Sequence, residues 1–194
     1  LLLHVIFQSK MADETGTFTI DDVIYSISEK LIRRHPHVFG EVSADGDKEV
    51  ASNWEAIKLK EGKESVLDGV PRHLPGLIRA QRMQEKASNV GFDWTEWELA
   101  WTKLNEEIDE WREAVKSQSI SEQKDEFGDL LFSLVNVGRL LGLHAEESIR
   151  LANKKFETRF RYIEESLRKR GGSVIDSNLE EMDKLWNEAK ELKL

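Results

Sequence analysis

Two pairs of acidic residues have the types and the spacing needed to bind a metal ion. Glu107 and Glu110 are three residues apart, and Glu126 and Asp129 repeat that spacing sixteen residues after Glu110. Because a helix advances by about 100° per residue, side chains three positions apart lie on the same face. Each pair therefore predicts two carboxylates on one side of a helix, and we expect Gly128 to occupy a packing position between the second two.

Apolar residues around the first pair indicate which carboxylates border the protein interior. One apolar stripe is formed by Leu104, Ile108, Trp111 and Val115. Glu107 and Glu110 lie along one flank of this stripe, together with Lys103. The helical wheel points three neighbouring acids the other way, into solvent: Glu106, Asp109 and Glu113. We therefore expect the first two acids, and not these three, to bind an ion.

The second pair borders a broader apolar face. That face is formed by Phe127, Leu130, Leu131, Leu134 and Leu141. Glu126 and Asp129 lie at its edge with Ser133. The connection between the two helices, around residues 117–121, is short, which favours antiparallel packing. All four carboxylates are then expected to converge at the edge of a core.

Carboxylates so close together raise each other's pKa or repel the helices unless a cation neutralises them. A site that offers only oxygen ligands favours Mg²⁺ or Mn²⁺. The chain has no cysteine, and no histidine lies near the acids in sequence, which argues against zinc. The sequence therefore predicts a magnesium site in which Mn²⁺ can substitute.

The elements that must position these acids are all predicted to be helices. Apolar residues recur at three- and four-residue spacing, and only three prolines interrupt the chain. Residues 19–22 and 177–181 have the residue types of helix starts, and Gly142 and Gly171 those of helix ends. The expected helices cover about residues 1–13, 20–34, 46–61, 74–89, 96–116, 121–141, 145–170 and 178–192.

An internal repeat relates the two ends of the chain. Residues 130–135 match residues 1–6, and residues 152–159 match residues 27–34. Residues 1 to about 40 are thus interpreted as the back half of a repeated unit. Since the first residue is Leu, we interpret the chain as a fragment that begins inside a helix. The expected organisation is a remnant of the first repeat with a connecting helix over 1–60, a linker over 61–75 and a catalytic domain over 76–194.

Composition excludes several classes of protein. There are 28 Lys and Arg residues against 37 Asp and Glu, a net charge of −9, which disfavours nucleic-acid binding. No apolar run approaches the roughly 20 residues of a membrane span, and no basic signal-peptide start is present. No phosphate-binding P-loop motif occurs. We expect a soluble, cytoplasmic protein without a membrane or nucleic-acid partner.

The acidic motifs and their surroundings resemble the MazG nucleoside triphosphate pyrophosphohydrolases of the all-α NTP pyrophosphatase superfamily. The resemblance covers most of the chain and includes residues 89–94, 128–132, 33–39 and 153–159. It implies a MazG-like helical bundle, with a four-helix core completed by dimerisation, in which Glu107, Glu110, Glu126 and Asp129 hold Mg²⁺. It also implies that basic and aromatic residues hold the triphosphate and base: Lys103, Lys155, Arg159, Trp186 and Lys190.

One position departs from the family. Similar proteins often have Lys four residues before the third acid, where this chain has Glu122, and Lys124 is close enough in sequence to replace it as a substrate contact. The reaction implied by the resemblance is hydrolysis of (d)NTP to (d)NMP and pyrophosphate. The residues leave open whether Glu107 or Glu110 accepts the proton from the attacking water.

Two alternatives remain at this point: a related all-α nucleotide hydrolase, dUTPase-like or acting on phosphoribosyl-ATP, and a catalytically inactive helical dimerisation module. We expect a homodimer, because the apolar face around Leu130 and Leu134 is too wide for one partner helix.

One metal site per chain is predicted. Among the remaining residues, four tryptophans are expected in the core (Trp94, Trp97, Trp101 and Trp111), and His35 and His37 in a loop.

Overall fold

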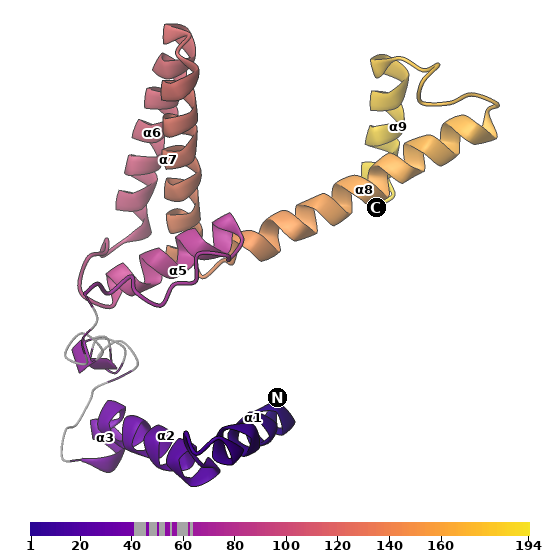
Figure 1. Ribbon diagram of the computed structural model, residues 1–194. Helices are drawn as coiled ribbons and strands as arrows, with labels where there is room; N and C mark the ends of the chain where they lie inside the picture. Colours follow the sequence, from indigo (N-terminus) through magenta and orange to yellow (C-terminus); the bar gives the residue numbers. More distant parts are fainter. Residues whose placement is uncertain (41–45, 47–49, 51–52, 55, 58–61, 63) are drawn as a thin grey trace. The chain divides into compact units, whose positions relative to one another are not determined.

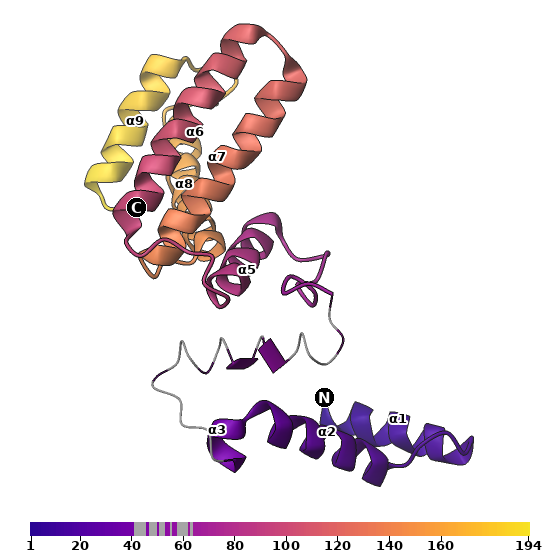
Figure 2. The ribbon, with the colours of Figure 1, turned by 90° about the vertical axis from the view of Figure 1, so that its left-hand side faces the viewer.

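In a computed structural model of the chain, which describes residues 1–40, 46, 50, 53–54, 56–57, 62 and 64–194, every regular element is a helix (Figures 1 and 2). The predicted all-α class is therefore confirmed. None of the described helices combines the length and the apolar character that a membrane crossing requires. The expected helix over 46–61 lies largely outside the described residues. The chain divides into two compact units, Leu1–Val70 with Glu85–Asp93, and Pro71–Gln84 with Trp94–Leu194.

The first unit contains α1 (Leu2–Glu14), α2 (Ile20–Arg34) and the four-residue helix α3 (Pro36–Phe39). A capping box starts α2. The backbone N–H of Asp22 donates to the Thr19 hydroxyl (3.2 Å), and the Asp22 carboxylate accepts from the Thr19 N–H (2.8 Å). The predicted bounds of α2 agree with the structure. The segment around His35 was expected to be a loop, but Pro36 begins α3 there, since proline is favoured at the first position of a helix.

In the second unit, α6 (Trp97–Ser117) and α7 (Ile120–Leu140) pack side by side as an antiparallel pair, as predicted (Figures 1 and 2). Gln118 ends α6 in the left-handed conformation (φ 60°), and the Ser119 side chain caps α7. Ala100, Leu104 and Val137 form the core between the two helices. The helix α5 (Gly76–Ser88) contributes Gln84, which donates to the Phe132 carbonyl on α7 (2.8 Å).

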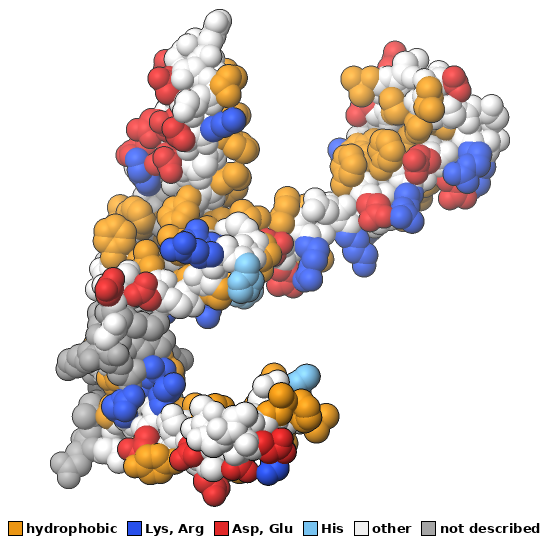
Figure 3. All heavy atoms as spheres, in the orientation of Figure 1, with side chains coloured by type: hydrophobic (Ala, Val, Ile, Leu, Met, Phe, Trp, Pro, Cys, Tyr) orange, Lys and Arg blue, Asp and Glu red, His pale blue; other side chains and the backbone are white. Residues whose placement is uncertain are grey.

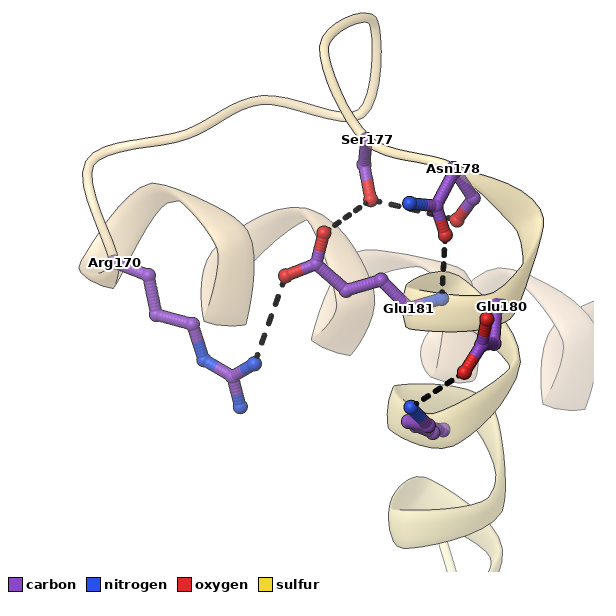
Figure 4. A network of polar contacts seen from close by, with 6 residues as sticks. Arg170, Ser177, Asn178, Glu180 and Glu181 are labelled. Atoms are coloured by element: carbon purple, nitrogen blue, oxygen red, sulfur yellow. Dashed lines mark hydrogen bonds and ion pairs between the residues drawn. The ribbon is translucent and has the colours of Figure 1, made fainter.

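The helices α8 (Ala145–Lys169) and α9 (Leu179–Glu191) form the other pair of this unit, around Ile163, Leu167 and Leu185. Figure 4 shows how α9 begins: the backbone N–H of Glu181 donates to the Asn178 side chain (2.9 Å), and the Ser177 hydroxyl donates to the Glu181 carboxylate (2.8 Å). Arg170, from the end of α8, lies 3.8 Å from the same carboxylate. The polar start of α9 is thereby tied to α8.

Several packing predictions were wrong. Val115 is 48% exposed, because the buried side of α6 continues from Leu104 to Ala114 instead. Trp94, Trp97 and Trp101 are exposed, whereas Trp111 is half-buried against the Phe127 ring, with 5.5 Å between centroids. A Cβ atom added at Gly128 would meet no atom within 4 Å, so this glycine does not serve close packing. The apolar face of α7, predicted to be too wide for one partner helix, is only partly covered: Phe127, Leu131 and Leu134, and Leu141 just after the helix, are exposed.

Candidate metal centre

Three of the four predicted ligands lie together between α6 and α7. One carboxylate oxygen from each of Glu107, Glu126 and Asp129 lies within 4.8 Å of those of the other two. Glu107 comes from α6, and the other two come from consecutive turns of α7. Figure 3 shows acidic side chains gathered over this pair of helices. Carboxylate oxygens at this spacing suit a hard divalent cation.

Glu107 is the buried member of the group, with 6% of its surface exposed. It follows Leu104 by three residues and precedes Ala114 by seven, so it lies on the buried side of α6 and not on its solvated side. A buried carboxylate is unfavourable unless a cation or hydrogen-bond donors compensate its charge. The position of Glu107 on the helix therefore buries its negative charge, and this charge requires a cation or hydrogen-bond donors nearby.

Lys103 supplies part of that compensation. Its Nζ atom lies 3.0 Å from Oε1 of Glu107 and 3.2 Å from Oε2 of Glu106. The hydrogen bond to Glu107, followed by the one to Glu106, raises the pKa of Lys103, and the charge of Glu110 adds to this. The ammonium group thus stays protonated beside the acids.

Glu126 shows the electrostatic consequence of the clustering. Loss of solvent around its carboxyl group raises its pKa, and the neighbouring charges of Glu110, Asp129 and Glu107 raise it further. Glu110 is exposed on α6 and lies outside the closest group of three, but its charge acts on Glu126. Like charges held this close favour binding of either a proton or a metal ion.

The acids assigned to solvent have partners of their own. Asp109 pairs with Arg112 (2.9 Å) and Glu113 pairs with Lys116 (2.6 Å), each three residues further along α6. All four side chains are more than 60% exposed. These acids are therefore neutralised on the outer side of the helix, away from the cluster.

Three of the residues expected to bind phosphate and base, Arg159, Trp186 and Lys190, form a second cluster, on α8 and α9. The guanidinium carbon of Arg159 lies 5.6 Å from the centroid of the Trp186 ring, and Nζ of Lys190 lies 6.0 Å from it. The Phe156 ring contacts Trp186 with 5.3 Å between centroids. The Nε–H of Arg159 donates to the Leu194 carbonyl (2.8 Å), and Lys155 is exposed one turn earlier on α8.

The departure at Glu122 has a structural explanation. Its carboxylate, in the first turn of α7, accepts a hydrogen bond from the hydroxyl of Ser117 at the end of α6 (2.6 Å), so it links the two helices across their connection. Lys124 is exposed on the same helix.

One further pairing, in the first unit, was missed in the sequence analysis. The guanidinium carbon of Arg34 lies 5.7 Å from the centroid of the Trp54 ring.

Several known proteins are similar in sequence to this chain. The model of the MazG nucleotide pyrophosphohydrolase domain matches residues 1–39 and 97–163, more than half of the chain. The nucleoside triphosphate pyrophosphohydrolase of Escherichia coli K12 is 45% identical over 98% of this chain and 74% of its own length. The nucleoside triphosphate pyrophosphohydrolase/pyrophosphatase MazG of Thermotoga maritima is 42% identical over 98% and 73%, respectively. The uncharacterized protein YabN of Bacillus subtilis is 46% identical over 98% of this chain and 40% of its own length.

The helical architecture, the carboxylate cluster and these matches define the class of all-α nucleotide pyrophosphohydrolases. Within that class the chain belongs to the MazG family, and the resemblance noted from its motifs is confirmed. The family and the acidic cluster together indicate a divalent metal ion.

Proposed function

We propose that this chain is a metal-dependent nucleoside triphosphate pyrophosphohydrolase, which converts (d)NTPs to (d)NMPs and pyrophosphate and acts on the cytoplasmic nucleotide pool. The observation that carries the proposal is the group of three carboxylates from α6 and α7 within 4.8 Å, one of them buried. The relatives named nucleoside triphosphate pyrophosphohydrolase support the choice of substrate and reaction.

The residues fit a magnesium site. Glu107, Glu126 and Asp129 offer oxygen ligands at short mutual distances, and Glu110 adds negative charge beside them. These four acids would hold the ion, with no cysteine in the chain to favour a softer metal. When bound, Mg²⁺ neutralises phosphate charge and makes a bound water a better nucleophile.

The cluster also supplies a base and a cation. A carboxylate of α6, Glu107 or Glu110, accepts the proton of the attacking water. Lys103, already held 3.0 Å from Glu107, presents its ammonium group at the edge of the carboxylates, where it attracts a substrate phosphate. We assign Lys124, exposed on α7, to the same electrostatic role.

We assign recognition of the nucleotide to the α8–α9 cluster. Lys155 and Arg159 are one turn apart on α8, which suits two contacts to one polyphosphate. Arg159 uses Nε for Leu194, and its terminal nitrogens provide the fork that binds phosphate oxygens. Trp186, flanked by Lys190, offers an aromatic surface for the base.

We propose a homodimer in which a second copy covers the apolar face of α7. Leu134 is 51% exposed and Leu131 is 39% exposed, three residues apart on one face of α7, a helix that packs against α6 through Val137. Contiguous apolar surface of this kind is typical of subunit interfaces. The catalytic domain of the proposal comprises residues 76–194.

An assay of pyrophosphate release with a panel of common and modified NTPs and Mg²⁺ tests the proposed function. We expect NMP and pyrophosphate in equal amounts and no γ-phosphate release. The Glu126→Gln variant should be inactive, whereas Asp109→Asn, which changes an acid on the outer side of α6, should be active. Absence of turnover for every NTP would contradict the proposal and favour an inactive dimerisation module.

A further inference from the structure

The first unit contains a basic and aromatic cluster that the proposed catalytic centre does not use. Arg34, at the end of α2, lies with its guanidinium carbon 5.7 Å from the Trp54 ring centroid. The His35 ring meets the same indole edge-on, with 4.7 Å between centroids, and its Nδ1 lies 2.7 Å from the Leu31 carbonyl oxygen. Arg34 and Trp54 are both half-buried.

The sequence repeats the residue types of the α8–α9 cluster at this place. Lys30 and Arg34 are four residues apart, as are Lys155 and Arg159. Trp54 is followed four residues later by Lys58, just as Trp186 is followed by Lys190. Lys58 lies outside the described residues, so its correspondence is one of sequence alone. Residues 1–39 also match the same family model as residues 97–163.

The geometry of the two arginine–tryptophan pairs agrees as well. The distance from guanidinium carbon to ring centroid is 5.7 Å for Arg34 and Trp54 and 5.6 Å for Arg159 and Trp186. In each pair a second aromatic ring contacts the indole: His35 at 4.7 Å in one and Phe156 at 5.3 Å in the other. In both units, therefore, an indole contacts a guanidinium group and a second aromatic ring.

We propose that the first unit binds a nucleotide, with its base stacked on Trp54 and its phosphates contacted by Arg34 and Lys30. Stacking on an indole recognises the aromatic base, and a guanidinium group recognises phosphate oxygens. The choice of ligand rests on the proposed function, because the matching cluster on α8 and α9 is assigned there to a nucleoside triphosphate.

Binding at this site does not require a metal ion. In the described part of the first unit, no group of three carboxylate or imidazole side chains is close enough to hold one. Because base stacking and the contacts of Arg34 and Lys30 with phosphate involve no metal ion, we expect nucleotide binding at this site to persist in the presence of a chelator.

The test is calorimetric titration of ATP in excess EDTA into the full chain carrying Arg159→Ala and Trp186→Ala, which removes the α8–α9 cluster. We expect this variant to bind one ATP per chain. Adding Arg34→Ala or Trp54→Ala should weaken that binding by at least about tenfold, as loss of one stacked base or charged contact predicts. The control is Arg33→Ala, which removes the adjacent positive charge and should leave binding unchanged. Circular dichroism and thermal unfolding check that each variant is folded.

No binding by the Arg159→Ala/Trp186→Ala variant, or equal binding with and without Arg34, would overturn the inference. Tripolyphosphate bound as tightly as ATP would overturn the assignment of Trp54 to a base. Failure of the proposed function looks different: the unaltered chain would then release no pyrophosphate from any NTP, while Arg34-dependent binding of ATP could still be measured.

Discussion

Lys103 and Glu107 form a salt bridge of 3.0 Å on one face of α6, in which the lysine side chain is 40% exposed and the glutamate side chain 8%. The pair links the surface of the helix to its buried side, and the carboxylate has Lys103 as its cationic partner. Glu107 thus depends on a cation for its burial, and the divalent ion of the proposed site can take over that role.

Replacing Lys103 by Met should destabilise the metal-free protein, because Glu107 then remains buried without its cation. Added Mg²⁺ should recover much of the loss. Urea unfolding of both proteins, with Mg²⁺ and with EDTA, measures the effect. The double variant Lys103→Met/Glu107→Gln should be more stable than the single one in EDTA, and a single variant as stable as the unaltered chain would contradict the prediction.

Loss of one carboxylate of the cluster should abolish turnover. We expect Glu126→Gln and Asp129→Asn each to lower kcat/KM by at least about a hundredfold, since each removes a charged ligand from the metal. Glu113→Gln and Asp109→Asn, on the outer side of α6, should change it by less than about twofold. Steady-state assays of pyrophosphate release make the comparison, and equal losses in the two groups would show that the helical-wheel assignment is wrong.

The contribution of Glu126 to the stability of the metal-free protein should fall as the pH rises past 4.5, the ordinary pKa of a Glu carboxyl group. The raised pKa of Glu126 means that the folded protein binds more protons than the unfolded chain in this interval, so deprotonation favours unfolding. Unfolding midpoints in EDTA between pH 4 and 7, compared with those of Glu126→Gln, isolate the effect. The unfolding midpoint should change with pH at a different slope in the two proteins over this interval. Parallel plots of the midpoint against pH would refute the prediction.

The core between α8 and α9 should be sensitive to truncation. Leu185 is 1% exposed, so Leu185→Ala is expected to lower the free energy of unfolding by about 2–5 kcal/mol. Leu179, on the same helix but 80% exposed, provides the matched control, for which Ala should have little effect. Denaturant titration monitored by far-ultraviolet circular dichroism measures both changes.

The apolar face of α7 should determine the oligomeric state. Light scattering at micromolar concentration is expected to show a dimer, and Leu134→Glu, which places a charge on that face, should yield monomers. A monomer already present in the unaltered chain would disprove the dimer.

Features set by local sequence were predictable. Thr19 and Asp22 indicated the start of α2 because their capping box involves residues three apart, and the acid pairs indicated their common face because helical geometry is regular. Burial was harder to predict. Trp97 and Val115 have large apolar side chains, as Leu104 has, but their exposure depends on where the partner helix lies, which residue type alone does not specify. The Arg34–Trp54 pair was missed for a related reason, since its members are twenty residues apart in sequence.

The left-handed Gln118 and the capping Ser119 are the two residues that connect α6 to α7. One additional residue in the first turn of α7 would rotate the rest of that helix by about 100° and advance it by about 1.5 Å. Glu126 and Asp129 would then face away from Glu107, although every acid would still be present. An insertion or deletion at this point should therefore be as harmful as loss of an acid, which makes the length of the connection itself a determinant of activity.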